Sequence, residues 1–304
     1  MLHTYIKNGP VSRTPGQAEV KMHTILSKMM VTERTWHMRV AAPLVARKCR
    51  AGQFIMLRIH DSGERIPLTI ADWDRDAGII DIYFQEIGAT TELLATLQAG
   101  DSILDVVGPL GNPSHVEKIT GTFVMVGGGF GIAAGYPVAR AFREAGNRVI
   151  AVLGVKTRKL LICEEMLRDV CHEVYVATND GSYGRQGLVS DVLQGLLDEG
   201  EDIGLVFPVG PPIMMKIISQ MTLPLKIKTM VSLNSVMVDG TGMCGSCRVT
   251  VAGRTRFVCS EGIDFDGHEV DWDEMMSRQK MYGKQEAEAL SYHHEHGACC
   301  GGVR

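Results

Sequence analysis

The sequence predicts a β + α/β fold: an antiparallel β domain, then a parallel-sheet α/β domain, then a small cysteine-bearing module. Three observations lead to this prediction. Short runs of β-branched and apolar residues fill the chain as far as residue 108. Strand and helix patterns then alternate, which implies βαβ units. Glycine, cysteine and aspartate finally concentrate in residues 239–267. We therefore expect domains at 1–115, 116–225 and 226–304.

The composition is that of an ordinary globular protein. The 304 residues are 45% hydrophobic and 22% charged, and the net charge of −4 favours neither nucleic acid nor an anionic membrane surface as a partner. The first residues carry no apolar signal region, and no run approaches about 18 uninterrupted apolar residues. We therefore expect a cytoplasmic protein without a membrane span.

The β domain is expected to contain short strands at 35–41, 54–60 and 78–85, separated by Gly, Asp and Pro. One helix is expected in this half of the chain, over residues 90–97. Short strands at this spacing are typical of a small barrel or sandwich.

The α/β domain is expected to begin with a strand at 122–126, a glycine-rich turn at 127–131 and an amphipathic helix at 132–145. Pro137 lies inside this helix pattern and should kink the helix or reset its start. The remaining elements alternate, with strands at 148–154, 173–178 and 205–209, and helices at 159–171, 188–197 and 212–221. The composition changes again after residues 225–233.

The eight cysteines are too sparse for a disulfide scaffold. In a reducing compartment, clustered cysteines indicate metal ligands or redox groups rather than structural disulfides. Three cysteines stand apart in apolar or mixed surroundings and are expected to be small buried hydrophobic residues: Cys49, Cys163 and Cys171.

Four potential ligands cluster in the third module. Asp239, Cys244 and Cys247 have D-x4-C-x2-C spacing, and Cys259 follows after eleven intervening residues. The spacing C-x4-C-x2-C with a distal fourth ligand wraps a 2Fe–2S cluster. Here an aspartate takes the first position, and its harder oxygen donor should shift the cluster potential. Glycines among the ligands allow close backbone approach and N–H bonds to sulfur: Gly240, Gly242 and Gly245. A structural zinc on the same side chains is the alternative, followed by a chance grouping.

Three segments of the β domain can contact a flavin. Arg65, followed four residues later by Thr69, can grip a pyrophosphate while the hydroxyl bonds near the isoalloxazine or ribityl chain. The alternative is an exposed arginine at a strand start. Segment 85–91 runs from a strand into a helix, whose N–H groups can receive phosphate. Segment 108–113 contains two prolines and should form a rigid turn.

The glycine-rich turn of the α/β domain is typical of a nucleotide site. Gly129, Gly131 and Ala134 match G-x-G-x-x-A between a strand and a helix, which suits a pyrophosphate at the helix N-terminus. The alternative is a tight strand–helix turn in any α/β domain. The acid expected about 20 residues later for NAD is missing. Basic residues occupy that region and leave NAD and NADP open: Lys156, Arg158 and Lys159. Loops at 178–184 and 209–215 also follow predicted strands.

With these segments assembled, residues 20–265 resemble the ferredoxin–NADP reductase superfamily. The order of flavin barrel, nucleotide domain and C-terminal 2Fe–2S module is similar to that of dihydroorotate dehydrogenase electron-transfer subunits. The chain most resembles the small subunits of NADH-dependent reduced ferredoxin:NADP oxidoreductases, which are flavin-based electron-bifurcating transhydrogenases. Segment 265–274 adds to this resemblance. The aspartate ligand separates the chain from the dihydroorotate branch, which uses four cysteines.

The resemblance implies FAD, NAD(H) and a 2Fe–2S cluster as cofactors. It places FAD contacts at Arg65, Pro67, Leu68, Thr69, Gly88, Thr91 and Gly108. It places NAD(H) contacts at Gly127, Gly128, Gly129, Gly131, Asp180, Gly181, Ser182, Gly210 and Pro211. The metal ligands remain Asp239, Cys244, Cys247 and Cys259.

The resemblance also implies a mechanism without acid–base or nucleophilic side chains. The nicotinamide exchanges a hydride with the flavin N5, and the reduced flavin exchanges single electrons with the cluster. The implied partner is a larger subunit, similar to a glutamate synthase small subunit, that carries FAD and 4Fe–4S clusters in a hetero-oligomer. Two other hypotheses stand beside this one. They are a reductase subunit of a dihydroorotate, sulfide or hydrogenase-linked system, and a zinc-bound redox-sensing or structural module.

The C-terminal tail lies outside the resemblance. It ends in a group of histidines and cysteines that could bind a metal, although we expect a disordered tail: His293, His294, His296, Cys299 and Cys300.

Overall fold

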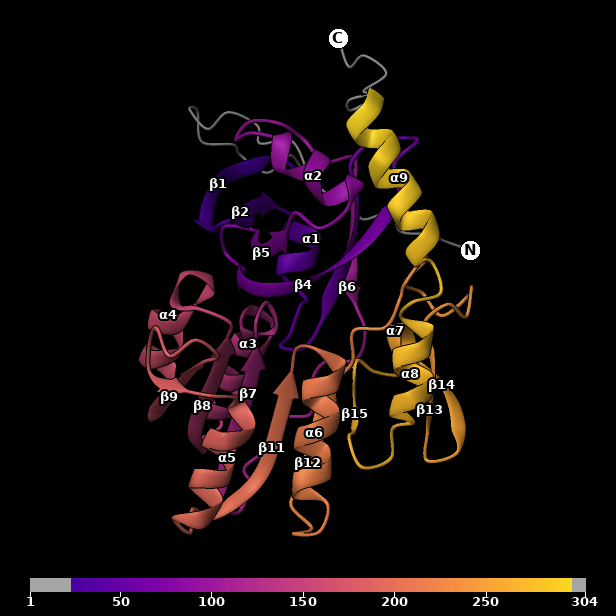
Figure 1. Cartoon of the computed structure of the whole chain (residues 1–304). Coiled ribbons are helices and arrows are strands. Elements are labelled where there is room, and N and C mark those ends of the chain that lie inside the picture. The colour runs from indigo at the N-terminus through magenta and orange to yellow at the C-terminus, as the bar shows by residue number, and fades with distance from the viewer. Residues whose placement is uncertain (1–22, 297–304) are drawn as a thin grey trace, which may run out of the picture.

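The computed structural model of the chain describes residues 23–296. They form three parts: a β domain at the top of Figure 1, an α/β domain at the lower left and the cysteine-bearing module at the lower right. The last helix runs from the module back to the β domain. No helix of this described range combines the length and the apolar character that crossing a lipid bilayer requires.

The β domain is a six-stranded antiparallel sheet with the order β1-β2-β5-β4-β3-β6. The sheet curves until its two ends meet, because Ile25 N donates to Asp101 O at 2.8 Å and Ile103 N donates to His23 O at 3.0 Å. It is therefore a partly closed barrel rather than a sandwich. Its elements are β1 (Ile25–Thr32), β2 (Thr35–Ala41), α1 (Pro43–Ala46), β3 (Phe54–Arg58), β4 (Arg65–Asp74), β5 (Ile79–Gln85), α2 (Ala89–Thr96) and β6 (Asp105–Leu110). The three expected strands and the expected helix correspond to β2, β3, β5 and α2.

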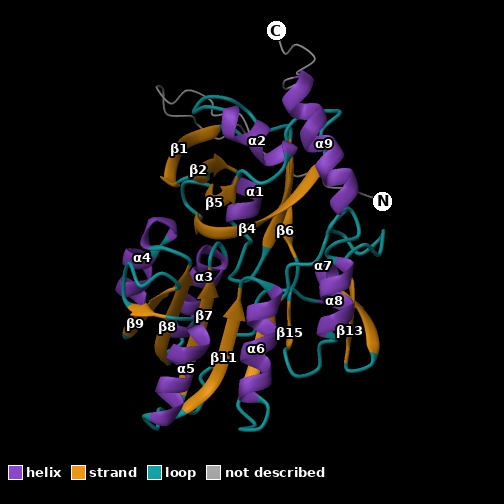
Figure 2. Ribbon diagram, in the orientation of Figure 1, coloured by secondary structure: helices purple, strands orange, loops and turns teal. Residues whose placement is uncertain are grey.

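The α/β domain is built on a seven-stranded sheet with the order β10-β9-β8-β7-β11-β12-β15, parallel except for β15. Its strands are β7 (Thr122–Gly128), β8 (Arg148–Val155), β9 (Glu173–Thr178), β10 (Arg185–Gln186), β11 (Ile203–Val209) and β12 (Lys228–Ser232). Its helices are α3 (Gly131–Glu144), α4 (Glu164–Val170), α5 (Val189–Asp198) and α6 (Pro212–Thr222), with the short 3-10 helix η1 (Arg158–Leu160). Helices cover both faces of the sheet (Figure 2).

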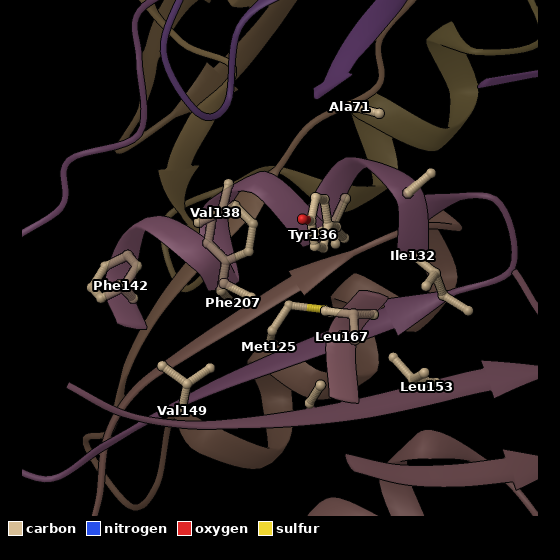
Figure 3. Close-up of a cluster of buried hydrophobic side chains, with 14 of the residues drawn as sticks. Ala71, Met125, Ile132, Tyr136, Val138, Phe142, Val149, Leu153, Leu167 and Phe207 are labelled. Atoms are coloured by element: carbon tan, nitrogen blue, oxygen red, sulfur yellow. The ribbon is translucent and has the colours of Figure 1, made fainter. Parts of the chain in front are cut away.

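Successive side chains of β7 point to opposite faces of the sheet, and both faces must be apolar here. Phe123 and Met125 belong to the core cluster beneath α3, and Phe123 stacks on Phe142 of that helix. Figure 3 shows Met125 and Phe142 in this cluster. Val124 and Val126 belong to a second cluster, with residues of α5 and α6. Both faces of the strand are therefore buried, as in other parallel sheets with helices on each side.

One helix prediction for this domain needs correction, and one of the two alternatives stated for Pro137 is excluded. The helix expected at 159–171 is divided into η1 and α4, because Cys163 between them adopts the left-handed conformation with φ 56°. A non-glycine residue in that conformation cannot continue a right-handed helix. Pro137 does not reset the start of its helix, since α3 already begins at Gly131.

The third module contains β13 (Arg248–Val251), β14 (Arg254–Phe257), α7 (Val258–Glu261), β15 (Asp264–Asp266), α8 (Trp272–Arg278) and α9 (Gly283–His296). Its strand β15 pairs with β12, so the sheet of the α/β domain continues past residue 225, where we expected the third domain to begin. Two backbone segments that are distant in sequence pair here. Hydrophobic periodicity carries no information about such pairing.

The tail expected to be disordered is helical as far as residue 296. Helix α9 packs on α2 (Figure 1). His294 Nε2 lies 2.8 Å from Glu92 Oε2, and His293 Nε2 lies 4.0 Å from the same oxygen. The two terminal cysteines, Cys299 and Cys300, lie outside the described residues.

A half-buried ion pair joins the barrel to the α/β domain. Arg140 of α3 contacts Asp72 of β4 at 2.7 Å, with 22% and 27% of the two side chains exposed. The guanidinium also stacks over the rings of Trp73 and Tyr136, at 5.1 and 5.2 Å. The pair combines charge, hydrogen bonding and cation–π contact at one interdomain position.

We predict that Arg140→Ala lowers the free energy of unfolding by about 1–3 kcal/mol, because it leaves Asp72 partly buried without its partner. Arg168→Ala is the matched control. It removes an i,i+4 pair with Glu164 in which Arg168 is 48% exposed, and should cost at most about 0.5 kcal/mol. Urea denaturation measures both changes, and equal effects of the two variants would contradict the interdomain role of Arg140.

Candidate functional site

The α/β sheet has its topological switch point between β7 and β11. Strand β7 lies between β8, which follows it through α3, and β11, so the strand order reverses at this place. In open α/β sheets a ligand binds outside the carboxyl ends of the strands at such a point. The glycine-rich turn after β7 and the segment Gly210–Pro211 after β11 both lie there, so the structure brings these two predicted nucleotide segments together.

Close backbone contacts between these two loops require glycine. A Cβ on Gly131 would stand 2.3 Å from Val209 O, and one on Gly210 would stand 2.7 Å from Gly128 O. The Met214 sulfur covers Gly128, because a Cβ on Gly128 would stand 2.4 Å from that sulfur. These glycines therefore close the loops onto each other.

Gly129 has a different environment and remains open to a ligand. Its φ is 54°, and no atom lies within 4 Å of its Cβ position. It precedes the N-terminus of α3, a helix of 14 residues. Backbone N–H groups and the helix dipole at such a position favour a phosphate group.

The predicted segment Asp180–Ser182 follows β9 at the same edge of the sheet, but two strands away from β7. It is bound to the loop after β8, since Ser182 Oγ accepts a hydrogen bond from Arg158 N at 2.8 Å. Asp180 accepts from Ser182 N at 3.0 Å, and hydrogen bonds from Ser182 lower the pKa of its carboxyl. The Arg158 guanidinium stacks over Tyr183 at 4.7 Å. These two joined loops can form the outer end of a dinucleotide site.

The candidate flavin strand β4 presents three of its four predicted residues on one face. Arg65, Pro67 and Thr69 alternate along the strand, and none of them is buried. Leu68 points the other way into the barrel core and is 8% exposed. The backbone of Leu68, rather than its side chain, is therefore the part that can contact a ligand on the outer face.

The N-terminus of α2 supports a different role for each of its two predicted residues. Gly88 is the N-cap residue, and no atom lies within 4 Å of its Cβ position, so its backbone is open to a ligand. The Thr91 hydroxyl accepts from Ile87 N and Gly88 N at 3.1 Å each and donates to Gly88 O at 3.0 Å. Thr91 therefore caps free backbone N–H groups at the start of the helix. Its hydroxyl already forms hydrogen bonds with the backbone.

Segment 108–110 forms the end of β6 rather than the rigid turn that we expected. The peptide bond between Gly108 and Pro109 is cis. A Cβ on Gly108 would approach Ile55 Cγ2 to 2.8 Å, so this glycine allows β6 to pack tightly on β3.

The loop that carries the predicted metal ligands is organised by Asp239. Its carboxylate accepts hydrogen bonds from the Thr241 hydroxyl at 2.5 Å, Met243 N at 3.1 Å and Cys244 N at 3.4 Å. The Thr241 hydroxyl is the main cause of the lowered pKa of Asp239. Cys244 is exposed, and hydrogen bonding to Ser246 lowers the pKa of its thiol. A carboxylate and one thiol thus stand at the surface in forms that release protons readily.

The other two thiols are buried side by side. Cys247 is 2% and Cys259 3% exposed, and their sulfur atoms lie 3.3 Å apart. Burial, with Cys247 as neighbour, raises the pKa of the Cys259 thiol to about 12. A bound metal must therefore displace a firmly held proton here, which makes metal binding pH-dependent.

The donor set fits a 2Fe–2S cluster. Three thiols and a carboxylate lie on one glycine-rich loop and on the short helix α7, and Gly240, Gly242 and Gly245 have positive φ values of 79°, 86° and 71°. Within residues 23–296, no three His, Cys, Asp or Glu side chains converge on one point that a single metal ion could occupy.

The metal-ligand loop packs directly against the candidate flavin strands. The Cβ position of Gly240 lies 2.5 Å from Met56 Cγ, and Met56 is the cross-strand partner of Pro67. Opposite residues in an antiparallel pair share one face of the sheet. Phe54 and Met56 also share a core cluster with Cys247 and Cys259. The predicted flavin and cluster residues therefore meet at one interface.

Phe54 and Met56 were not among the predicted site residues. They belong to an apolar strand whose sequence does not distinguish a side chain at a domain interface from one in the barrel core. Only the third module, which is distant in sequence, gives these two residues their role.

Comparison with known proteins supports this organisation. Residues 234–271 match the family model described as the iron–sulfur cluster binding domain of dihydroorotate dehydrogenase B. The chain is 43% identical over 265 residues to a protein of Thermotoga maritima named as a dihydroorotate dehydrogenase B (NAD(+)) electron transfer subunit homolog, covering 87% of this chain and 93% of that protein. It is 32% identical over 255 residues to the electron transfer subunit of Geobacillus thermodenitrificans, covering 81% and 96%.

Solved structures agree with the sequence relatives. A structure of the NADH-dependent reduced ferredoxin-NADP oxidoreductase, described in connection with flavin-based electron bifurcation, has a TM-score of 0.85 and 40% identity, covering 92% of this chain and 99% of that chain. A ferredoxin NADP+ reductase from Neisseria gonorrhoeae has a TM-score of 0.54 at 19% identity, covering 68% and 92%. The second likeness concerns the fold alone.

We predict that Gly131→Ala weakens binding of a dinucleotide several-fold and lowers the unfolding midpoint, because the new Cβ would meet the Val209 carbonyl at 2.3 Å. Gly283→Ala is the control, since no atom lies within 4 Å of that Cβ position. NADH titration and thermal unfolding test the two variants. Unchanged affinity and midpoint in Gly131→Ala would contradict the close approach of β7 and β11.

Proposed function

Because the chain belongs to the family of dihydroorotate dehydrogenase B electron-transfer subunits and their homologues, we propose that it passes electrons between NAD(H), FAD and a 2Fe–2S cluster in a flavin-based electron-bifurcating oxidoreductase. The observation that carries this proposal is the contact of the metal-ligand loop with the candidate flavin strands. Gly240 touches Met56, which stands opposite Pro67. Two one-electron partners must lie close together, and this interface supplies that proximity.

The chemistry belongs to the cofactors, since bound FAD can exchange a hydride with nicotinamide and single electrons with an iron–sulfur cluster. The protein orients them. Arg65 and Thr69 lie on the outer face of β4 to hold the flavin pyrophosphate and ribityl region. The open backbone at Gly129 receives the dinucleotide pyrophosphate. Asp239 and the three neighbouring cysteines hold the cluster. No described side chain is assigned an acid–base role.

A larger partner subunit completes the electron path. Cys244 and Met243 are exposed, and Met243 retains 87% of its accessible surface. One side of the ligand loop therefore faces solvent, where a second redox protein can approach. We propose a partner similar to a glutamate synthase small subunit that carries FAD and 4Fe–4S clusters and handles the ferredoxin and NADP chemistry.

A dihydroorotate-linked reductase is the second candidate function. It is favoured by relatives such as the Geobacillus thermodenitrificans subunit, at 32% identity over 81% of this chain. The two functions require different partner subunits. Anaerobic purification of the native complex, with identification of the co-purifying subunit and measurement of iron and flavin, distinguishes them. A colourless complex without iron and flavin would remove both.

We predict that Cys247→Ser abolishes the visible and EPR signals of the cluster, while NADH still reduces bound FAD. The reason is that one buried thiolate ligand is lost but the nucleotide and flavin residues are untouched. Cys171→Ser is the control and should keep the cluster. If NADH no longer reduced FAD in a folded Cys247→Ser protein, the order of the redox centres proposed here would be wrong.

We predict that Arg65→Ala purifies with markedly less FAD, because it removes the charge-assisted hydrogen bonds to the pyrophosphate. Arg47→Ala removes an exposed arginine of the same domain and should retain FAD. Flavin absorbance per polypeptide measures the difference. Equal flavin content in the two variants would show that the flavin site lies elsewhere.

A further inference from the structure

The linker between the barrel and the α/β domain makes three hydrogen bonds to the third module. Asn112 N donates to Gly262 O at 2.7 Å, and Asn112 Nδ2 donates to Glu261 O at 3.0 Å. Ser114 Oγ donates to Asp264 Oδ2 at 2.5 Å. We call these contacts of residues 112–114 with residues 261–264 the linker clasp.

The linker clasp connects the two candidate cofactor sites over short stretches of chain. Its first half directly follows β6, which ends at Leu110, and its second half directly follows α7, which carries Cys259. Ser114 is also fixed to the barrel, because its N–H donates to Ala51 O at 2.9 Å. Gly52 leaves room for this contact, since a Cβ there would stand 2.2 Å from Ser114 Oγ.

Asp264 is the one ionisable side chain that forms a hydrogen bond in the linker clasp. The residue as a whole is half-buried, but one of its carboxylate oxygens is shielded from solvent. It stands on β15 opposite Ser232 of β12, so it joins the third module to the α/β sheet as well. Its Oδ2 is hydrogen-bonded, whereas its Oδ1 is buried and lacks a partner within the described part of the chain. Burial raises the pKa of this carboxyl to about 7, against the lowering effect of hydrogen bonds from Ser114 and Ser232.

The charged groups around Asp264 do not neutralise it. His115 and Glu117 of the linker and Lys228 of β12 line the adjoining cavity of about 140 Å³, but all three are exposed. His115 is paired with Glu117 at 3.4 Å. On the third module, Glu261 is paired with Arg256, and Asp266 is half-exposed beside His268. An ionised Asp264 would therefore be a buried charge without a counter-ion, which is costly.

We propose that Asp264 is a positioning residue: protonated, it holds the cluster module against the flavin-binding barrel, and ionised, it loosens this contact and slows electron transfer from flavin to cluster. The proposal rests on the function proposed above. It concerns the distance between the two cofactors and assigns no proton to the electron-transfer step itself.

The sign of the pH dependence follows from linkage. The folded-state pKa lies above the unfolded value, so the folded chain binds more protons. The contribution of Asp264 to stability therefore falls as pH rises from about 4 to about 7 and is constant above that range. Within the folded protein, the ionised fraction grows as pH passes through about 7, and the linker clasp weakens in the same range.

The test is stopped-flow reduction of the holoprotein by NADH, with FAD and cluster absorbance followed separately from about pH 6 to about pH 9. We expect the flavin-to-cluster rate of the wild type to fall several-fold across this range. Asp264→Asn should give a flat profile, because the amide cannot ionise. Asp266→Asn, on the same strand but half-exposed, is the matched control and should follow the wild type. A flat wild-type profile, or a pH-dependent one in Asp264→Asn, would overturn the proposal.

Ser114→Ala keeps the test decisive if Asp264→Asn does not fold. It removes one donor to the carboxylate but leaves the backbone contact to Ala51, so the midpoint of the rate profile should move to higher pH. An unchanged or lower midpoint would also overturn the proposal. Failure of the proposed function would look different, since the protein would then contain no FAD or iron to follow. In that case the loss of pH dependence in the unfolding midpoint of Asp264→Asn still reports on Asp264.

Discussion

The arrangement of this protein depends on the packing of one glycine-rich loop against strand β3 of the β-barrel. Gly240 approaches Met56 so closely that any Cβ would overlap it. This contact lies one residue from Asp239, the first proposed ligand, and one cross-strand pair from Pro67 on the proposed flavin face. Electron transfer requires that the two cofactors lie close together and does not require reactive side chains. The close packing at this interface therefore matters more for the proposed function than any single polar group.

The second constraint is electrostatic and acts within the ligand set. Two of the proposed thiol ligands are buried, and burial raises the pKa of the Cys259 thiol, while the third thiol and the carboxylate stand near the surface with lowered pKa values. One side of the ligand loop is thus anchored in the core with Phe54 and Met56, and the other faces solvent. Such an asymmetric site is suited to a relay, with its flavin inside the subunit and its next partner outside.

The sequence allowed prediction of those elements that depend on residue spacing and hydrophobic periodicity within a short segment. Spacing grouped the proposed ligands Asp239 and Cys244, which the structure places on one loop, and period and glycine content located β7 and the start of α3. It could not recover what depends on tertiary contact. Strands β12 and β15 both lie beyond the predicted boundary at residue 225, yet both extend the sheet of the α/β domain. Leu68 lies within a predicted flavin motif, but its side chain points into the barrel core. The Thr91 hydroxyl is hydrogen-bonded to backbone groups of its own helix start, which no sequence motif reveals.

The linker clasp shows why such tertiary features matter for function. Asn112 and Ser114 have no motif of their own, and two of their three bonds go to backbone carbonyls that any sequence would supply. The third bond goes to Asp264, a carboxyl that an apolar side chain could replace if the position served stability alone. Retaining an ionisable group where all three parts of the chain meet costs stability that is lost progressively as pH rises from about 4 to about 7. The same group makes the contact between barrel and cluster module sensitive to protons in a way that an apolar residue cannot.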